Sequence, residues 1–218
     1  MPLDPSARTP VMCITMDGLA LGHSEQVARL CEAGARWIQL RMKNAPRDGW
    51  LSEALQAVNI CRRHGAVLIV NDDVDIAMLS GADGVHVGSQ DMAWHEARRR
   101  LEPGMILGGT VNNAADADRA AAAGCLDYVG VGPLRFTGTK ANLAPVLGLD
   151  GARDLLRLLG GLPAWVIGGV EVADLPSLYG IGAAGAAVSS ALFRGGQVEE
   201  TFRRFQAAWP APNAAHLA

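Results

Sequence analysis

Short apolar runs alternate with longer amphipathic segments along most of the chain. The runs are five or six residues long and lie at residues 11–15, 36–41, 66–71, 84–88, 105–109, 127–132, 164–169 and 186–190. The segments between them repeat apolar residues at helical spacing, as Val27, Leu30 and Cys31 do at i, i+3 and i+4. This alternation predicts eight strand–helix units in succession.

Glycines mark the ends of several predicted helices. Residues 24–34, 50–65 and 114–124 each have a helical pattern that finishes at a glycine, the residue favoured just after a helix. Residues 170–182 have a weaker helical pattern, and we expect Pro176 to break or kink it.

Strands that are apolar on both faces and alternate with helices indicate a parallel sheet. Eight such units predict an α/β fold, a single-domain (β/α)8 TIM barrel with its active site at the carboxyl ends of the strands. An open doubly wound sheet is the alternative, but no G-x-G-x-x-G follows the first run. We expect one domain over residues 1–218, a core at about 11–208, and weakly ordered ends at residues 1–10 and 209–218.

Composition restricts the partners and the compartment. The 218 residues carry a net charge of −3 without a basic tract, so we expect neither nucleic acid nor an anionic membrane as partner. No apolar stretch approaches the ~20 residues of a membrane-spanning helix, and the N-terminus lacks a signal-peptide pattern, which favours a cytoplasmic location. A homo-oligomer remains open. Four widely spaced cysteines predict small core residues rather than disulfides or zinc ligands: Cys13, Cys31, Cys61 and Cys125.

Three long polar side chains alternate with apolar ones at the second run. Gln39, Arg41 and Lys43 fall on one face because successive strand residues point to opposite sides. In a closed barrel we expect this face to line the mouth, with Ile38 and Leu40 facing the helices. An edge strand with a solvated face is the alternative, but a closed barrel has no edge. Two cations and an amide together point to a phosphate or diphosphate ligand.

Lysine is rare in this chain. Only Lys43 and Lys140 are lysines among 19 Lys and Arg residues, which leaves 17 arginines. Both fall at predicted strand-end or loop positions, where a compact ammonium can follow a departing phosphate oxygen better than a planar guanidinium can. Compositional bias alone also leaves lysines at such places, so the count supports a role without proving it.

Two aspartates follow neighbouring strands. Asp72 comes after the third run and Asp91 after the fourth, so adjacent strand ends bring them close. Their carboxylates are hard oxygen ligands of the kind that Mg²⁺ takes beside a phosphate, and helix N-capping is the alternative role. We assign Asp73 and Asp75 to the cap or first turn of the next helix, and His86 to the core.

The longest connection lies at residues 132–148, after the sixth strand. Ordinary strand-to-helix loops span about 2–6 residues, so this one is predicted to be functional. It carries two hydroxyl groups and the second lysine, at Thr137, Thr139 and Lys140.

Small and hydroxylated residues close the last strands. Gly168 and Gly169 end the seventh, and Ser189 and Ser190 end the eighth, where barrels commonly bind phosphate through backbone N–H groups. A tight turn is the alternative role of the glycines. Together with Thr110 at the end of the fifth strand, these residues give the mouth two sites for anions. One site is lined by cationic side chains, and the other is neutral. Two phosphorylated substrates suggest a joining reaction in which Mg²⁺-bound diphosphate leaves.

Seven segments carry a resemblance that runs from about residue 11 to 205. They are QLRMK (39–43), VNDD (70–73), GADGVHVGSQDM (81–92), GVGP (130–133), TGTK (137–140), PVLGLDG (145–151) and IGG (167–169). In this order and spacing they resemble the thiamine-phosphate synthase family. The resemblance implies a transferase that condenses 4-amino-5-hydroxymethyl-2-methylpyrimidine diphosphate with 4-methyl-5-(2-hydroxyethyl)thiazole phosphate, giving thiamine phosphate and pyrophosphate.

The resemblance also implies roles for individual residues. The pyrimidine diphosphate is expected at Gln39, Arg41, Lys43, Asn71, Thr110 and Lys140. Mg²⁺ is expected at Asp72 and Asp91, and the thiazole phosphate at Thr137, Gly138, Thr139, Gly169, Ser189 and Ser190. In the family's chemistry the diphosphate leaves first, and the thiazole nitrogen attacks a pyrimidine-stabilised cation. Arg41, Lys43 and Lys140 are then catalytic through leaving-group stabilisation. No general base is needed, and we expect no histidine–carboxylate pair at the mouth.

Two positions depart from the family pattern. Met42 stands where glutamate is frequent, and it should face away from the mouth with little effect. Thr110 stands where serine is frequent, so it keeps the hydroxyl and adds a methyl group that tightens the pyrimidine pocket.

Two other functions are weighed. The sister thiazole tautomerases need a histidine shortly after the fifth strand, and residues 108–116 (GGTVNNAAD) contain none. A catalytically silent phosphate-binding barrel would not need both Asp72 and Asp91.

Overall fold

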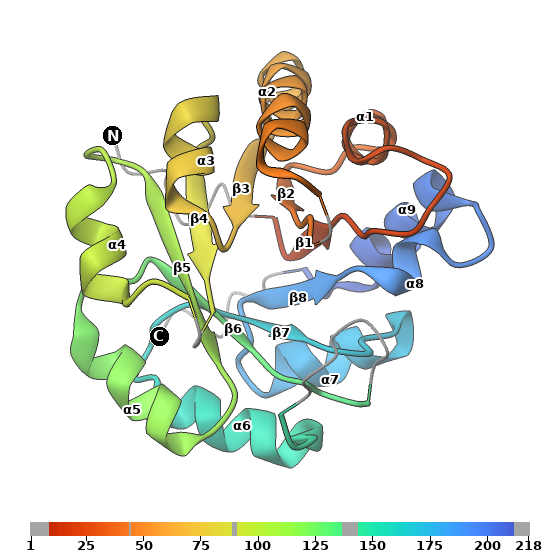
Figure 1. Cartoon of the computed structure of the whole chain (residues 1–218). Coiled ribbons are helices and arrows are strands. Elements are labelled where there is room, and N and C mark those ends of the chain that lie inside the picture. The colour runs from red at the N-terminus through yellow and green to blue at the C-terminus, as the bar shows by residue number, and fades with distance from the viewer. Residues whose placement is uncertain (1–8, 44, 89–90, 137–143, 212–218) are drawn as a thin grey trace.

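Eight parallel strands form a closed barrel in chain order, with β1 paired to β8 (Figure 1). This computed structural model describes residues 9–211 except 44, 89–90 and 137–143. The predicted TIM barrel is confirmed. The strands are β1 Val11–Ile14, β2 Trp37–Leu40, β3 Val67–Asn71, β4 Gly84–Val87, β5 Ile106–Val111, β6 Tyr128–Val131, β7 Ala164–Ile167 and β8 Gly185–Val188.

Helices follow the strands and surround the barrel (Figure 1). They are α1 His23–Glu32, α2 Arg47–His64, α3 Val74–Ser80, α4 Trp94–Arg100, α5 Ala114–Ala123, α6 Gly148–Leu158, the 3₁₀ turn η2 Val172–Asp174, α7 Leu175–Gly180, α8 Ser190–Phe193 and α9 Val198–Ala208. Gly65 and Gly124 end α2 and α5 in the left-handed conformation, as expected. The segment 170–182 is interrupted beside Pro176, as expected: the 3₁₀ turn η2 ends at Asp174 and α7 begins at Leu175. Pro176 lies in the first turn of α7, where a missing N–H costs no helical hydrogen bond.

Three aromatic side chains fill the barrel near the amino ends of its strands. The Trp37 and Trp165 rings stack with centroids 5.8 Å apart, and Tyr128 meets them edge-on at 5.6 and 5.7 Å. Each is at most 2% exposed, so this end of the barrel is a packed core. Such ring pairs stabilise the fold beyond the apolar area that they bury. The polar residues described below lie toward the opposite end, the mouth.

Gly108 on β5 makes room for one of these rings. A Cβ at this position would lie 2.3 Å from Cζ of Tyr128. We therefore expect Gly108→Ala to lower the free energy of unfolding by about 2 kcal/mol through overpacking, measured by urea denaturation. Gly180 ends α7 with open space around it, so Gly180→Ala is the control and should leave stability unchanged or raised. Equal stability of both variants would contradict the tight fit at Tyr128.

The cysteines and the described C-terminal residues pack outside the barrel. Cys13, Cys31 and Cys61 are buried between the barrel and its helices, as predicted, while Cys125 is half-buried. Trp209 contacts Tyr179 edge-to-face, with ring centroids 5.9 Å apart. Among the helices that the structure describes, none combines the length and apolar composition needed to cross a membrane.

Candidate active site

Polar side chains from β2 to β5 form a layer inside the barrel toward its mouth. Each is at most 9% exposed, and the layer consists of Gln39, Asn71, His86 and Thr110. The Gln39 amide lies 3.9 Å from Met12 Sδ inside the barrel, whereas Ile38 and Leu40 pack in the outer core beneath the helices. The predicted alternation along β2 is therefore confirmed.

His86 holds the hydroxyl of Thr110 in place. Its Nε2 lies 2.9 Å from Thr110 Oγ1, and its Nδ1 lies 3.1 Å from the Tyr128 hydroxyl. Both ring nitrogens thus have partners, which confirms the expectation of a satisfied core histidine. The packed aromatic core below is connected through His86 to the hydroxyl at the mouth.

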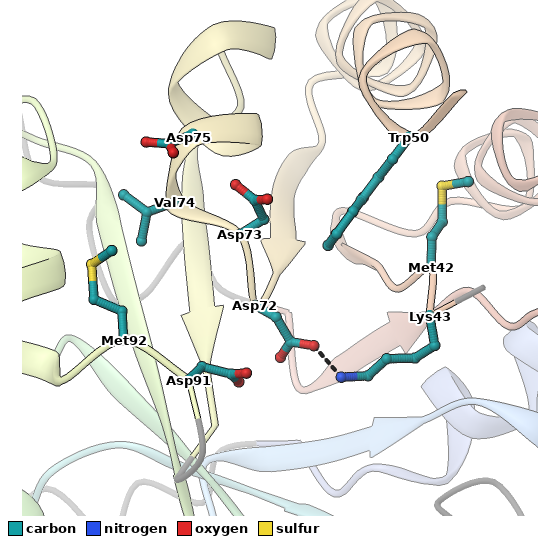
Figure 2. A pocket seen from close by; sticks show the side chains of 9 residues that line it. All are labelled: Met42, Lys43, Trp50, Asp72, Asp73, Val74, Asp75, Asp91 and Met92. Atoms are coloured by element: carbon teal, nitrogen blue, oxygen red, sulfur yellow. Dashed lines mark hydrogen bonds and ion pairs between the residues drawn. The ribbon is translucent and has the colours of Figure 1, made fainter. Parts of the chain in front are cut away.

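The segments that follow the carboxyl ends of β2, β3 and β4 bring one lysine and two aspartates together (Figure 2). Lys43 Nζ forms an ion pair with Asp72 Oδ2, and the Asp91 carboxyl lies close enough to Asp72 to raise its pKa. Asp72 has a φ of 67°, and its N–H donates to the His86 carbonyl at 2.7 Å. Asp91 accepts from the Gly88 N–H at 2.8 Å. Asparagine and aspartate tolerate this left-handed backbone better than other L-residues, so the turn after β3 suits Asp72.

Burial and a second carboxylate act together on Asp72. Burial raises the pKa of Asp72 above its usual range, the Asp91 carboxyl raises it further, and the Lys43 ammonium opposes both. An additional cation beside Asp72 would stabilise the ionised form of its carboxyl group. The site is therefore prepared for positive charge in addition to Lys43.

A cleft of about 400 Å³ opens beside this cluster, as Figure 2 shows. Its wall includes the side chains of Met42, Trp50 and Met92. Met42 is 7% exposed and packs against the outer core, as the alternation predicts, but it also reaches this cleft, which the sequence did not indicate. The cleft is also lined by Lys43 and by the carboxylates of Asp72, Asp73, Asp75 and Asp91.

Further aspartates at the cleft are neutralised by arginines. Asp73 caps α3 by accepting from the Ile76 N–H at 2.8 Å, and Asp75 lies in the first turn, both as assigned from the sequence. Arg47 pairs with Asp73 at 2.9 Å and with Asp75 at 3.5 Å, and Arg100 also pairs with Asp75. These carboxylates serve the helix and its surface.

The ends of β7 and β8 present glycines and a buried hydroxyl. Gly168 and Gly169 have φ values of 97° and 69°, and a Cβ on Gly168 would lie 2.7 Å from Pro133. These glycines are thus required by a tight turn. The Ser189 hydroxyl is buried and has no hydrogen-bond partner among the described residues, while the neighbouring Ser190 begins α8.

Several predicted residues are not placed with these groups. The loop candidates Thr137, Gly138, Thr139 and Lys140 lie outside the described residues. Arg135, just before them, pairs with Asp174 and donates to the Gly169 carbonyl at 3.1 Å, so the described start of this loop lies against the end of β7.

Comparison with known proteins identifies the family. A family model described as thiamine monophosphate synthase matches residues 11–192. The chain belongs to this family. A thiamine-phosphate synthase of Bacteroides fragilis is 41% identical over 186 residues, which cover 83% of this chain and 91% of that protein. A thiamine-phosphate synthase of Myxococcus xanthus is 44% identical over 180 residues, covering 83% and 82%.

A solved thiamine phosphate pyrophosphorylase has the same barrel. The thiamine phosphate pyrophosphorylase from Pyrococcus furiosus superposes with a TM-score of 0.84 at 29% identity, covering 94% of this chain and 97% of that chain. Every candidate residue named above lies inside the span that the family model matches.

In this family member, the structure adds mouth residues that the sequence analysis missed. Thr15 and Asp17 follow β1, and both contact the first residue of α1, His23. The expectation of no histidine–carboxylate pair at the mouth was wrong, because His23 Nε2 lies 3.2 Å from Asp17 Oδ1. The alternation of Thr15 and Asp17 around Met16, where the first apolar run ends, was the available signal.

The donors at Asp72 and Asp91 fit a magnesium ion. Two adjacent carboxylates, one of them largely buried, form the hard-oxygen pair that Mg²⁺ takes together with substrate phosphates and water. No group of three or more His, Cys, Asp or Glu side chains within the described ranges forms a metal cluster. The remaining ligands would accordingly come from substrate and solvent.

Proposed function

We propose that this chain is a thiamine-phosphate synthase. It joins a pyrimidine diphosphate to a thiazole phosphate and releases pyrophosphate with thiamine phosphate. The observation that carries the proposal is the cluster of Lys43, Asp72 and Asp91 at the barrel mouth, in a chain 41% identical to proteins of that name. The tautomerase alternative gains no support from these relatives.

We assign the pyrimidine diphosphate to the cationic side of the mouth. The polar layer receives the ring, and the cations beyond it receive the diphosphate. The residues of this subsite are Gln39, Arg41, Lys43, Asn71, Thr110 and Lys140. The support is geometric for the described members: a buried amide and hydroxyl lie inside the barrel, and an ammonium lies at its rim. Thr110 offers a hydroxyl already oriented by His86.

Asp72 and Asp91 hold Mg²⁺ in this proposal. When bound, the ion supplies positive charge that neutralises the diphosphate as it leaves. The two carboxylates would hold the ion beside Lys43, whose ammonium already contacts Asp72. A cation held by these residues would offset the charge repulsion between the two carboxyls.

We place the thiazole phosphate at the later strand ends, where no cation is needed. The residues of this subsite are Thr137, Gly138, Thr139, Gly169, Ser189 and Ser190. The buried Ser189 hydroxyl supports this placement because a phosphate oxygen would satisfy its hydrogen bond. The second substrate is then held across the mouth from the diphosphate.

The arrangement favours a reaction in which the leaving group departs before the new bond forms. Arg41, Lys43 and Lys140 stabilise the negative charge on the departing diphosphate. The thiazole nitrogen supplies the electron pair of the new C–N bond and loses no proton, so this chain needs no general base for the step. His86 is engaged by Thr110 and Tyr128 and serves to orient the hydroxyl.

The test is a coupled assay with the purified chain, both substrates and Mg²⁺. We expect equal amounts of pyrophosphate and thiamine phosphate, each dependent on both substrates. Removing the metal with EDTA should lower the rate at least about 100-fold, and added Mg²⁺ should restore it. Interconversion of thiazole tautomers without pyrophosphate release would instead establish the tautomerase function.

A further inference from the structure

The segment that carries the cations of the mouth continues past the end of its strand. β2 ends at Leu40, so Arg41 and Lys43 lie outside the sheet. The Thr15 N–H donates to the Gln39 carbonyl at 3.0 Å in the last backbone contact between the two chain segments. Backbone N–H groups beyond that point still need acceptors wherever they are shielded from water.

Side chains from the loop after β1 supply those acceptors. The Arg41 N–H donates to Thr15 Oγ1 at 3.0 Å, and the Lys43 N–H donates to Asp17 Oδ2 at 3.1 Å. Donors and acceptors are both spaced by two residues, which is the period of a strand. Side-chain oxygens thus extend the β1–β2 ladder by two hydrogen bonds after the backbones diverge.

His23 fixes both acceptors at once. It is 8% exposed, and its Nδ1 lies 2.9 Å from Thr15 Oγ1 while its Nε2 lies 3.2 Å from Asp17 Oδ1. Because an ionised carboxylate only accepts, Nε2 must carry a hydrogen. In the neutral ring Nδ1 is then the acceptor, and the Thr15 hydroxyl donates to it while accepting from Arg41. In this tautomer each hydrogen bond from the Arg41 N–H through Thr15 and His23 to Asp17 has one donor and one acceptor.

Gln26 anchors the loop from behind. This fully buried amide accepts from the Met16 N–H and donates to the Met16 carbonyl, both at 3.0 Å, and also donates to the Leu21 carbonyl at 3.0 Å. The residue between Thr15 and Asp17 is therefore held through both of its backbone polar groups. A loop tied in this way is a rigid template rather than a passive connection.

We propose that Asp17 and His23 are positioning residues for the cationic segment after β2, which carries Arg41 and Lys43. They fix the backbone at Arg41 and Lys43 and thereby aim the Lys43 ammonium at Asp72, where the diphosphate binds. The inference rests on the proposed function, because it gives the diphosphate subsite its geometry. In this proposal neither Asp17 nor His23 touches the reacting atoms.

The test compares Asp17→Ala with Asp17→Asn in steady-state kinetics with each substrate varied. Asp17→Ala should lower kcat/KM for the pyrimidine diphosphate about 30-fold and leave the KM for the thiazole phosphate within about twofold, since small misplacements of a binding group are costly. Asp17→Asn should retain at least about a third of wild-type kcat/KM, because its amide oxygen still accepts from the Lys43 N–H and its amide N–H can donate to Nε2 of the other neutral His23 tautomer. Asp118→Ala, on the exposed side of α5, is the control.

The outcomes separate positioning from the alternatives. Equal losses in Asp17→Asn and Asp17→Ala would overturn the proposal in favour of a charge effect. A rise in the KM for the thiazole phosphate as large as that for the pyrimidine diphosphate would overturn it as well. His23→Leu should reproduce Asp17→Ala without changing the shape of the pH–kcat profile; loss of one limb of that profile would make His23 a proton-transfer group and overturn the proposal.

A binding measurement keeps this test independent of the proposed function. Calorimetric titration with pyrophosphate and Mg²⁺ should give a Kd at least about tenfold weaker for Asp17→Ala than for wild type and for Asp118→Ala. If the wild type makes no thiamine phosphate but this difference remains, the proposed function fails and the positioning role stands. Equal pyrophosphate affinities would overturn the positioning role whatever the activity.

Discussion

Replacing Asp91 with asparagine is expected to lower kcat/KM about 1,000-fold without lowering the stability of the fold. The amide keeps an oxygen for the Gly88 N–H but loses the charge that would hold Mg²⁺. It also relieves the repulsion on Asp72, whose pKa is raised by burial and by the neighbouring carboxyl. The coupled pyrophosphate assay and urea denaturation in EDTA measure the two effects separately.

The same substitution should change how stability depends on pH. A carboxyl whose folded-state pKa is raised contributes stability below its unfolded pKa, about 4 for aspartate, and loses it as pH rises through the folded pKa. Burial and Asp91 cause this loss at Asp72 in the wild type. The unfolding free energy of Asp91→Asn relative to wild type should therefore increase as pH rises above about 4. A decrease as pH rises would show that the two carboxyls do not repel each other.

Replacing Lys43 with methionine is expected to lower kcat about 100-fold. The aliphatic stem is retained, so the change isolates the ammonium that stabilises the leaving diphosphate. The side chain is 45% exposed, and its pair with Asp72 contributes at most about 1 kcal/mol to stability. Rapid-quench measurement of pyrophosphate release under single-turnover conditions would locate the loss in the chemical step.

Two matched variants make the Lys43 result specific. Arg63→Met removes a cation from the exposed end of α2 and should leave kcat unchanged. Lys43→Arg restores the charge in a planar fork and should recover only part of the activity. Full activity in Lys43→Met would remove this ammonium from the proposed chemistry.

The barrel and one side of its mouth could be predicted from the sequence because strand alternation is a local property. Gln39 lies inside and Ile38 and Leu40 lie outside, as period two requires. The juxtaposition of Asp72 and Asp91 also followed, because parallel neighbouring strands end at the same edge. In each case position along a strand determines position in space.

Contacts that depend on loop conformation were not predictable in this way. Thr15 and Asp17 reach the β2 segment through side chains, and His23 joins them from the next helix, so the set emerges only when three segments are folded together. Pro176, by contrast, was predictable because proline does not fit a helix interior: the 3₁₀ turn ends at Asp174 and α7 begins at Leu175.

The aromatic core of Trp37, Tyr128 and Trp165 has a consequence for the order of events in turnover. These rings pack the amino-terminal end of the barrel, so in the part of the chain that the structure describes we expect ligands to reach the polar layer from the mouth. Both substrates enter, and both products leave, past the same rim. The product that departs last thus blocks the next round of loading, and it should behave as the stronger inhibitor against the substrate that binds first.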